Sequence, residues 1–286
     1  MITLNDIGIT FHAHTPDENK ALKNINLTIN KGDFITVIGS NGAGKSTLYN
    51  VIAGSLQPTT GTIILDTGDT SSADDKSALN KSRSTTRDTT RDITHDKEYR
   101  RAQYIGRIFQ NPLLGTAGKM SLEDNMIIAS KKGFKGLRIS LTNKMRDYFR
   151  DQLSVLNMGL EDRLRDNVEQ FSGGQRQALT LLMAVMSKPA LLLLDEHTAA
   201  LDPTNAAIIM ELTRKFAKEY NLTVMMVTHN MQQALDYGSR LLMMDAGEII
   251  LDINEQEKAK LTMDDIVEKF KSIKKHSLDN DQMLLQ

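Results

Sequence analysis

A glycine-rich stretch at residues 39–47 constrains this chain more than any other feature of its sequence. Its residues are Gly-Ser-Asn-Gly-Ala-Gly-Lys-Ser-Thr, which match the phosphate-binding pattern G-x-x-x-x-G-K-[ST]. The apolar run from Phe34 to Ile38 precedes the stretch, and Lys45 to Ala53 has a helical pattern. Glycines let backbone N–H groups curl around phosphate oxygens, and the helix directs its positive N-terminus at them. The chain is therefore expected to contain a strand–loop–helix unit that binds phosphates.

We expect every residue of this loop to contribute to a nucleotide site: Gly39, Ser40, Asn41, Gly42, Ala43, Gly44, Lys45, Ser46 and Thr47. In loops of this kind the lysine reaches the β- and γ-phosphates, which assigns that role to Lys45. The hydroxyl of the following residue binds Mg²⁺, which makes Ser46 a candidate metal ligand. The motif occurs once in the sequence.

A second motif is an apolar strand that ends in two carboxylates. Leu191 to Leu194 is followed directly by Asp195 and Glu196. A strand end beside a phosphate loop is where a Mg²⁺-holding carboxylate and a base for the attacking water are needed. Acidic residues often follow buried strands, so this motif indicates a catalytic site only because the same chain also contains the phosphate loop. We predict Asp195 as a metal ligand and Glu196 as the catalytic base.

The pattern of apolar residues predicts an α/β fold. Strands are expected at residues 2–10, 25–29, 34–38, 62–65, 104–109, 191–194, 224–227 and 241–244. Helical patterns cover residues 45–53, 121–158, 174–186 and 204–220. Several of the strands are continuous apolar runs, as in parallel sheets that are covered on both faces. The middle of the chain is expected to be a helical insertion.

Residues 67–101 do not fit this pattern. They are rich in Ser, Thr, Asp, Lys and Arg and contain Thr-Thr-Arg-Asp twice, at residues 85–88 and 89–92. Such a composition buries too little apolar surface to offset the entropy of ordering, so we predict a mobile surface loop. A docking or regulatory segment is the alternative.

Composition excludes several classes of function. The chain has no cysteine, which rules out disulfides, thiolate zinc sites and thiol catalysis. Its net charge of −1 gives no overall electrostatic signal for nucleic acid. The N-terminus lacks the pattern of a signal peptide, and no apolar run approaches the roughly 20 residues of a spanning helix. Any role at a membrane is expected to depend on partners.

The segment that follows the central helical region indicates a family. Phe171 is followed by Ser172, Gly173, Gly174 and Gln175, directly before a predicted helix. Taken alone, this could be a simple helix N-cap. Placed between the phosphate loop and the Asp195–Glu196 pair, it resembles the signature sequence of ABC ATPases, in which the first residue is usually Leu. The phosphate-binding residues of that signature are all present.

The resemblance extends over nearly the whole chain and implies four further site residues. Gln110 resembles the glutamine that senses the γ-phosphate, binds the metal and contacts the membrane subunit. Asp202, in Ala-Ala-Leu-Asp, resembles the D-loop aspartate, and His229 resembles the switch histidine that contacts the γ-phosphate. Phe11 stands where an aromatic ring stacks on adenine, usually a Tyr. Each has an alternative from the residues alone: a surface glutamine, a helix cap, a strand-end histidine and a core aromatic.

Two other features are interpreted as structural. His197 follows Glu196 where the family usually has Pro, and we expect it to support the loop. An apolar stripe near the C-terminus, made of Ile266, Val267, Phe270 and Ile273, is expected to pack on the domain.

The resemblance implies a P-loop NTPase of the ABC ATPase type, with a mixed sheet core, a small antiparallel β subdomain and a helical subdomain. It implies one domain over residues 1–286. Within it we expect the polar insertion at 67–101, a helical subdomain at 112–188 that ends in the signature helix, and a helical tail at 254–286.

The resemblance also implies cofactors and partners. ATP and Mg²⁺ would bind between two copies of the chain, with Ser172, Gly173, Gly174 and Gln175 acting on the partner copy's phosphate loop. Transmembrane permease subunits would hold the dimer at the cytoplasmic face of the membrane, and an extracytoplasmic substrate-binding protein would deliver the solute. No nucleic-acid partner is expected. Three functions stay open: an importer ATPase, for which the resemblance suggests aromatic amino acids as the solute, an exporter ATPase, and a soluble ABC ATPase not linked to transport.

Overall fold

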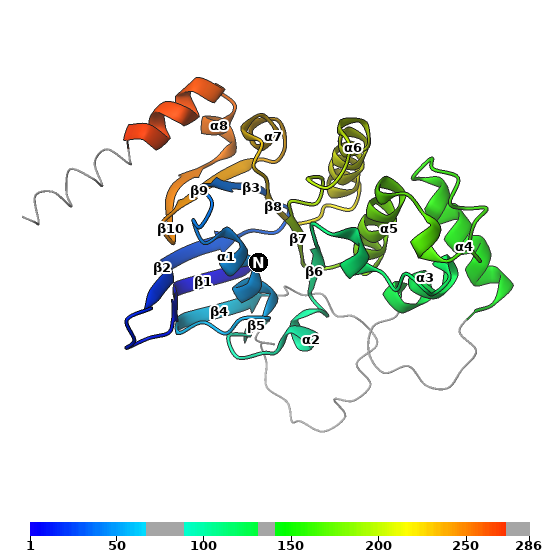
Figure 1. Ribbon diagram of the computed structural model, residues 1–286, viewed down its shortest axis with the longest axis horizontal. Helices are drawn as coiled ribbons and strands as arrows, with labels where there is room; N and C mark the ends of the chain where they lie inside the picture. Colours follow the sequence, from blue (N-terminus) through cyan, green and yellow to red (C-terminus); the bar gives the residue numbers. More distant parts are fainter. Residues whose placement is uncertain (67–88, 131–140, 273–286) are drawn as a thin grey trace, which may run out of the picture.

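The structure is a computed structural model that describes residues 1–66, 89–130 and 141–272. Its strands form two sheets, and Figure 1 shows four helices gathered on the side away from the smaller sheet: α3 (Leu122–Ser130), α4 (Asn143–Ser154), α5 (Gly173–Met186) and α6 (Pro203–Glu219). Within the described ranges, no helix is long and apolar enough to cross a membrane. The predicted combination of a mixed sheet, a small antiparallel sheet and a helical region is confirmed.

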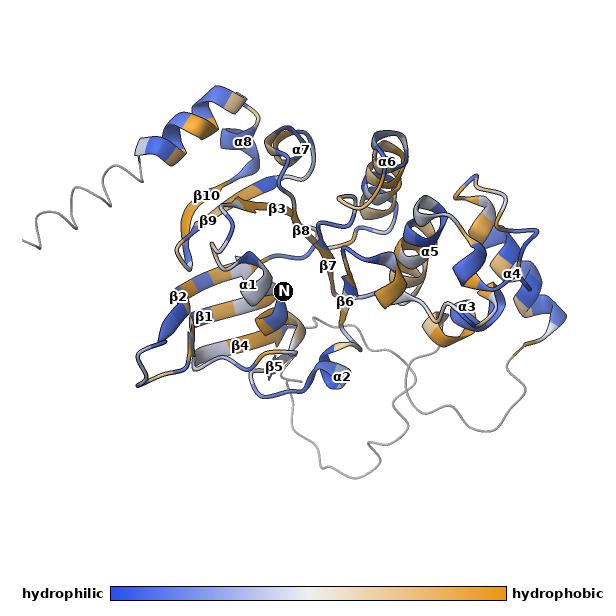
Figure 2. Cartoon of the chain, in the orientation of Figure 1, coloured by the Kyte–Doolittle hydropathy of each residue, from blue (hydrophilic) through white to orange (hydrophobic). Residues whose placement is uncertain are grey.

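The central sheet has the strand order β10-β9-β3-β8-β7-β6. Its strands are β3 (Phe34–Gly39), β6 (Ile105–Ile108), β7 (Leu191–Asp195), β8 (Val224–Val227), β9 (Arg240–Asp245) and β10 (Glu248–Ile253). All neighbours are parallel except β9 and β10. The strands β3, β7 and β8 are apolar along most of their length, as Figure 2 shows, because both faces of the sheet are covered.

The parallel register brings the candidate motifs to one edge of the central sheet. Val37 and Asp195 both pair with Val227, so β3, β8 and β7 end side by side. The phosphate loop after β3, Glu196 after β7 and His229 after β8 therefore emerge at the same carboxyl edge, where ligands bind in open α/β sheets.

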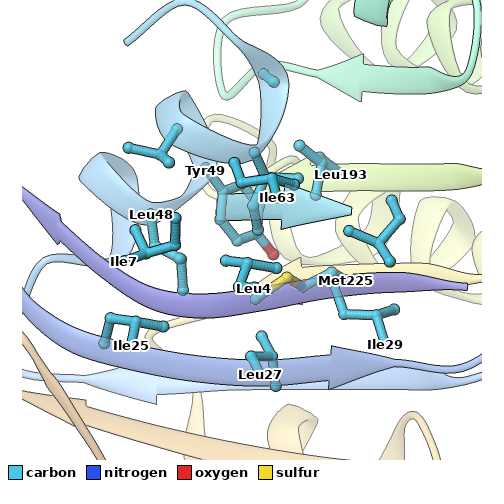
Figure 3. Close-up of a cluster of buried hydrophobic side chains, with 14 of the residues drawn as sticks. Leu4, Ile7, Ile25, Leu27, Ile29, Leu48, Tyr49, Ile63, Leu193 and Met225 are labelled. Carbon is cyan, nitrogen blue, oxygen red and sulfur yellow. The ribbon is translucent and has the colours of Figure 1, made fainter. Parts of the chain in front are cut away.

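The smaller sheet is antiparallel, with the order β2-β1-β4-β5. Its strands are β1 (Ile2–Phe11), β2 (Asn19–Ile29), β4 (Thr60–Asp66) and β5 (Thr90–Asp92). One of its faces packs against α1 (Lys45–Ala53) and the central sheet. Figure 3 shows this shared core, in which Leu4 and Ile63 from the small sheet lie near Tyr49 of α1 and Met225 of β8. The core fixes the helix that follows the phosphate loop between the two sheets.

The helical region covers the other side of the central sheet. It contains the 3-10 helices η1 (Pro112–Gly115) and η2 (Val168–Gln170) and the helices α3 (Leu122–Ser130), α4 (Asn143–Ser154) and α5 (Gly173–Met186). The helix α6 (Pro203–Glu219) packs against α5. These helices share a second core, in which Phe149, Leu181 and Phe216 are buried.

The C-terminal part adds α7 (Met231–Asp236), α8 (Glu255–Lys258) and a helix over residues 263–272. Ile266 is fully buried, and Phe270 packs on the cluster that contains Ile38 and Met243. The interpretation of the C-terminal apolar stripe as packing is therefore confirmed for these two residues. Ile273 lies outside the described residues.

The prediction of a mobile insertion over 67–101 is wrong for its last part. Residues 90–92 form β5, paired with β4, and Glu98–Arg101 forms the short helix α2. Ile93 and Arg101 are buried. The Arg101 guanidinium donates to the carbonyls of Val51 and Ile52, at the end of α1, and to two carbonyls of its own segment. The polar composition of the segment did not predict this packing, because the buried residue that holds the segment against α1 is an arginine. Residues 67–88 lie outside the described residues.

Candidate functional site

The phosphate loop has the backbone of an anion cradle. Gly42 and Gly44 have φ values of +82° and +98°, in the left-handed region that favours glycine. A Cβ at Gly44 would lie 2.7 Å from the carbonyl oxygen of Ala21, so a larger residue does not fit. The helix α1 begins at Lys45 without a side-chain cap. The first N–H groups of α1 are therefore available to an anion, and the helix dipole favours negative charge there.

Lys45 is held inside this loop. Its Nζ donates to the carbonyls of Gly39 at 2.7 Å and Ser40 at 2.9 Å. Burial lowers the pKa of Lys45, while the charges of Glu196 and Asp195 oppose that shift. The hydroxyl of Ser40 donates to Asp245 at 2.7 Å, which attaches the loop to the end of β9. The ammonium is thus positioned by the loop backbone and faces the two carboxylates that follow β7.

A cleft of about 540 Å³ opens over the loop. Its walls are Phe11, Asn19, Lys20, Ala21 and Lys23 from the small sheet, residues 41–47 of the loop and α1, Glu196 and His229, and the turn Ala246–Gly247. A volume of this size suits a small-molecule or cofactor ligand. The structure brings Phe11, most of the phosphate loop, Glu196 and His229 together, as their sequence positions predict.

Glu196 and His229 are in direct contact across the cleft. The Nε2 atom of His229 lies 2.5 Å from Oε1 of Glu196. Glu196 has a φ of +47°, unusual for a residue other than glycine, and its N–H donates to the carbonyl of Val227. Strained backbone is common at functional sites, where the surrounding structure holds it in place. The contact fixes the direction of the carboxylate beside the phosphate loop.

Asp195 and Gln110 lie outside the walls of this cleft. The Asp195 carboxylate, at the end of β7, is 18% exposed and lies 3.4 Å from Nη2 of Arg107. Gln110 is exposed, two residues beyond β6. Together with the exposed hydroxyl of Ser46, these side chains offer oxygen atoms, the donor type that Mg²⁺ prefers. In the described ranges no group of three His, Cys, Asp or Glu side chains could hold a metal ion alone, and Mg²⁺ is commonly bound by one or two carboxylates together with substrate phosphates. The donor set fits Mg²⁺ in that form.

The signature residues form the N-terminus of α5. Ser172 and Gln175 make a reciprocal capping box, with N···O distances of 3.2 and 3.1 Å, and the Gln175 amide also donates to the carbonyl of Met158. Gly174 faces Asn205, where a Cβ would lie 2.5 Å from the amide oxygen. Asn205 in turn donates from its backbone N–H and its side chain to Asp202, which caps α6. The N-termini of α5 and α6 are therefore in contact and form one continuous surface.

None of Ser172, Gly173, Gly174, Gln175 and Asp202 lines the cleft of its own chain. The helix-cap alternative for Asp202 describes what the structure shows, and the side chain's hydrogen bonds with Asn205 lower the pKa of its carboxyl group. Within one chain, the structure therefore leaves the signature and the phosphate loop as two separate surfaces.

His197 is structural, as expected. It is buried, and its Nε2 lies 3.1 Å from the hydroxyl of Thr213 in α6. Burial lowers the pKa of His197 to about 4, so the ring is neutral at physiological pH.

Sequence reasoning missed several residues around the cleft. Lys20 and Lys23 belong to no motif, and Gly247 reaches the loop only because its N–H donates to Ala43. Arg107, which does not line the cleft but pairs with Asp195, carries a recognisable signal, since it is a charged residue inside the strand β6, directly before Ile-Phe-Gln. A cation in an otherwise buried strand usually has a buried partner.

Comparison with known proteins decides the family. The family described as ABC transporter matches residues 22–199, which is more than half of the chain. The chain belongs to the ABC transporter family. A tyrosine transport ATP-binding protein of Clostridioides difficile is 39% identical over 94% of this chain and 98% of that protein. A phosphonates import ATP-binding protein of Oceanobacillus iheyensis is 30% identical over 93% of both chains.

Solved structures agree with this assignment. A dimeric ATP-binding cassette, in a post-hydrolysis state with ADP and phosphate, has a TM-score of 0.66 and 25% identity, over 89% of this chain and 99% of that one. The prediction of an ABC ATPase is confirmed: the chain is the ATP-binding, ATP-hydrolysing subunit of an ABC transporter.

Proposed function

We propose that this ABC ATPase powers uptake of a small solute, delivered by a substrate-binding protein, through separate permease subunits. The main support for ATP hydrolysis at this site is the Glu196–His229 contact at the wall of the phosphate-loop cleft. Import is supported by the relatives, which are named for tyrosine transport and for phosphonates import. The higher identity to the tyrosine transport protein supports an aromatic amino acid as the solute.

Each group in the cleft has a proposed role in hydrolysis. Phe11 supplies a ring face for adenine, and Lys45 with the loop N–H groups binds the phosphates. Glu196 accepts the proton of the attacking water, and His229 orients that carboxylate and contacts the γ-phosphate. Ser46, Asp195 and Gln110 would hold Mg²⁺. When bound, the ion neutralises charge on the phosphate oxygens.

The second half of the site comes from another copy of the chain. The positive N-terminus of α5, formed by Ser172, Gly173, Gly174 and Gln175, suits a phosphate but does not line the cleft of its own chain. A two-fold dimer would place this surface, with Asp202, opposite the phosphate loop of the partner. The dimeric solved relative supports this arrangement.

The whole chain, residues 1–286, is proposed as one domain with a helical subdomain at 112–188 and a helical tail from 254. The 3-10 helix after Gln110 exposes Leu113 and Leu114, which suits contact with a permease at the cytoplasmic face of the membrane.

Reconstitution with permease subunits in vesicles tests the proposal. We expect ATP-dependent uptake of labelled tyrosine that requires the binding protein. ATPase activity that no permease stimulates would overturn the transport role in favour of a soluble ATPase. Efflux of the solute instead of uptake would favour an exporter.

A further inference from the structure

Arg107 links two parts of the site that the sequence motifs treat separately. It lies in β6, three residues before Gln110, and its side chain is 15% exposed. Its Nη2 lies 3.4 Å from Oδ2 of Asp195, and its guanidinium carbon lies 4.7 Å from the centroid of the Phe109 ring. One side chain therefore touches the proposed metal ligand and the residue next to the proposed γ-phosphate sensor.

The contact with Asp195 is loose. Charge-assisted N–H···O bonds are usually 2.7–2.9 Å long, so a distance of 3.4 Å is a weak ion pair. Nε of Arg107 is buried and has no hydrogen-bond partner in the described part of the chain. The guanidinium is thus incompletely satisfied where it lies, which favours its exchange for a better cation at Asp195.

Tyr49 is a buried phenol whose ring is close enough to Asp195 and Arg107 to feel the charge of both. It lies in the core next to Ile63, as Figure 3 shows, and its hydroxyl is buried without a hydrogen-bond partner among the described residues. Burial raises the pKa of Tyr49 well above its usual value, and the charge of Asp195 adds to that shift. The phenol is therefore neutral and supplies no counter-charge. Lys45 bonds to loop carbonyls, which leaves Arg107 as the cation in contact with Asp195 in the described structure.

We propose that Arg107 is a positioning residue that takes the place of Mg²⁺ at Asp195, and that Mg–ATP displaces it and so moves the Phe109–Gln110 segment. The inference rests on the proposed role of Asp195 as a metal ligand. Arg107 neutralises Asp195 while the metal is absent, and the stacked Phe109 ring transmits its displacement to Gln110. The position of the Phe109–Gln110 segment, which precedes the exposed Leu113 and Leu114, therefore depends on whether the metal is bound.

Nucleotide affinity with and without metal tests this role directly. ATP binding to the purified full chain is measured by calorimetry in excess Mg²⁺ and in EDTA, for wild type, Arg107→Met and Arg107→Lys. Without Arg107, the uncompensated Asp195 repels metal-free ATP, whereas Mg–ATP no longer competes with the guanidinium. We expect the ratio of the two affinities to rise up to about fivefold in Arg107→Met, the range of a weak ion pair, and less in Arg107→Lys.

A merely structural role would weaken both affinities alike and leave their ratio unchanged, which would overturn the proposal. Arg163→Met is the matched control, because Arg163 also stacks on an aromatic ring, that of Phe171 at 4.6 Å, and also pairs with an aspartate, Asp166. The ratio should not change in this control. In an Asp195→Asn background, Arg107→Met should also have no effect on the ratio.

A fluorescent reporter tests the transmitted movement. The chain has no tryptophan, so Phe109→Trp places a single indole in the ring position under Arg107. Mg–ATP should change its emission markedly when Arg107 is present and only slightly in Arg107→Met. An equal response in both would refute the coupling. If Mg²⁺ affects neither the ATP affinity of the wild type nor the emission of Phe109→Trp with Arg107 present, the proposed metal site itself fails, which is a different outcome from failure of the Arg107 role.

Discussion

Nε2 of His229 lies 2.5 Å from Oε1 of Glu196, so the end of β8 holds the carboxylate that follows β7. The N–H of Glu196 also donates to the carbonyl of Val227, so the backbone of Glu196 is tied to the end of β8 as well. An oriented carboxylate beside the phosphate loop is what activation of a water molecule requires.

Glu196→Gln should abolish ATP turnover and preserve ATP binding. The amide keeps the size of the side chain but cannot accept the proton of the attacking water, and the loss is expected to be at least about 10²-fold. Turnover and equilibrium binding are measured on the same preparation. Glu248→Gln, an exposed change on β10, is the control and should behave as wild type. Near-normal hydrolysis in Glu196→Gln would exclude this residue as the base.

Lys45→Ala should weaken ATP binding itself. The change deletes a charged contact to the phosphates, worth about 1.5–3 kcal/mol, or roughly tenfold or more in affinity. Because Lys45 also bonds to the carbonyls of Gly39 and Ser40, the melting temperature must be recorded alongside. Unchanged nucleotide affinity in a folded variant would contradict the assignment of the loop.

Mixing a Lys45→Ala chain with a Ser172→Arg chain should restore one intact site. Each variant alone breaks both composite sites of its dimer, because every site needs one phosphate loop and one signature surface. The mixed dimer pairs the intact loop with the intact signature once, so about half of the sites recover. Nucleotide trapping in a verified heterodimer is the measurement. Absence of recovery would mean that each site is contained within one chain.

Arg101→Met should destabilise the domain by about 2–4 kcal/mol, since several buried carbonyls lose their donor. Gly54 makes room for this side chain, because a Cβ there would lie 2.8 Å from Cδ of Arg101. Chemical denaturation measures the free energy of unfolding. Arg100→Met is the control, since the neighbouring Arg100 is largely exposed and should tolerate the change. Equal stabilities would show that α2 does not anchor α1.

Acid should destabilise the protein partly through His197. Its folded pKa of about 4 lies below the ordinary value of 6.5, so the unfolded chain takes up a proton first as the pH falls. The stability from neutral His197 is complete above about pH 6.5, falls by about 2 kcal/mol at pH 5, and levels off below pH 4. His197→Gln, which can still bond to Thr213, should flatten this dependence between pH 7 and 5. An unchanged slope would exclude His197 as the cause.

The strands and the motifs at their ends could be predicted because both depend on local sequence patterns. Apolar runs such as Leu191–Leu194 identify buried parallel strands, and glycines at fixed spacing identify the loop. The parallel register then makes the meeting of the loop with Glu196 and His229 a geometric consequence. These are properties of neighbouring residues, and the sequence displays them.

Other features depend on contacts between distant segments and could not be predicted. Nothing near Arg101 shows that it ends under α1, and nothing near Lys20 shows that it borders the cleft. Gln110 and Asp202 were assigned through a family resemblance, and the structure of a single chain places both outside the cleft. Their proposed roles require a metal ion or a second copy of the chain. The pattern of apolar and polar residues in one sequence does not contain that information.

The pairing of β4 with β5 has a consequence for how this domain tolerates change. Asp66 and Thr90 are partners in adjacent strands, so the two points at which the described chain stops and resumes around residues 67–88 lie next to each other. The entropy of closing a loop grows only slowly with its length, so material of very different length can be accommodated between such fixed ends. An affinity tag or a reporter domain grafted between the two strands is therefore expected to leave the catalytic edge of the central sheet undisturbed.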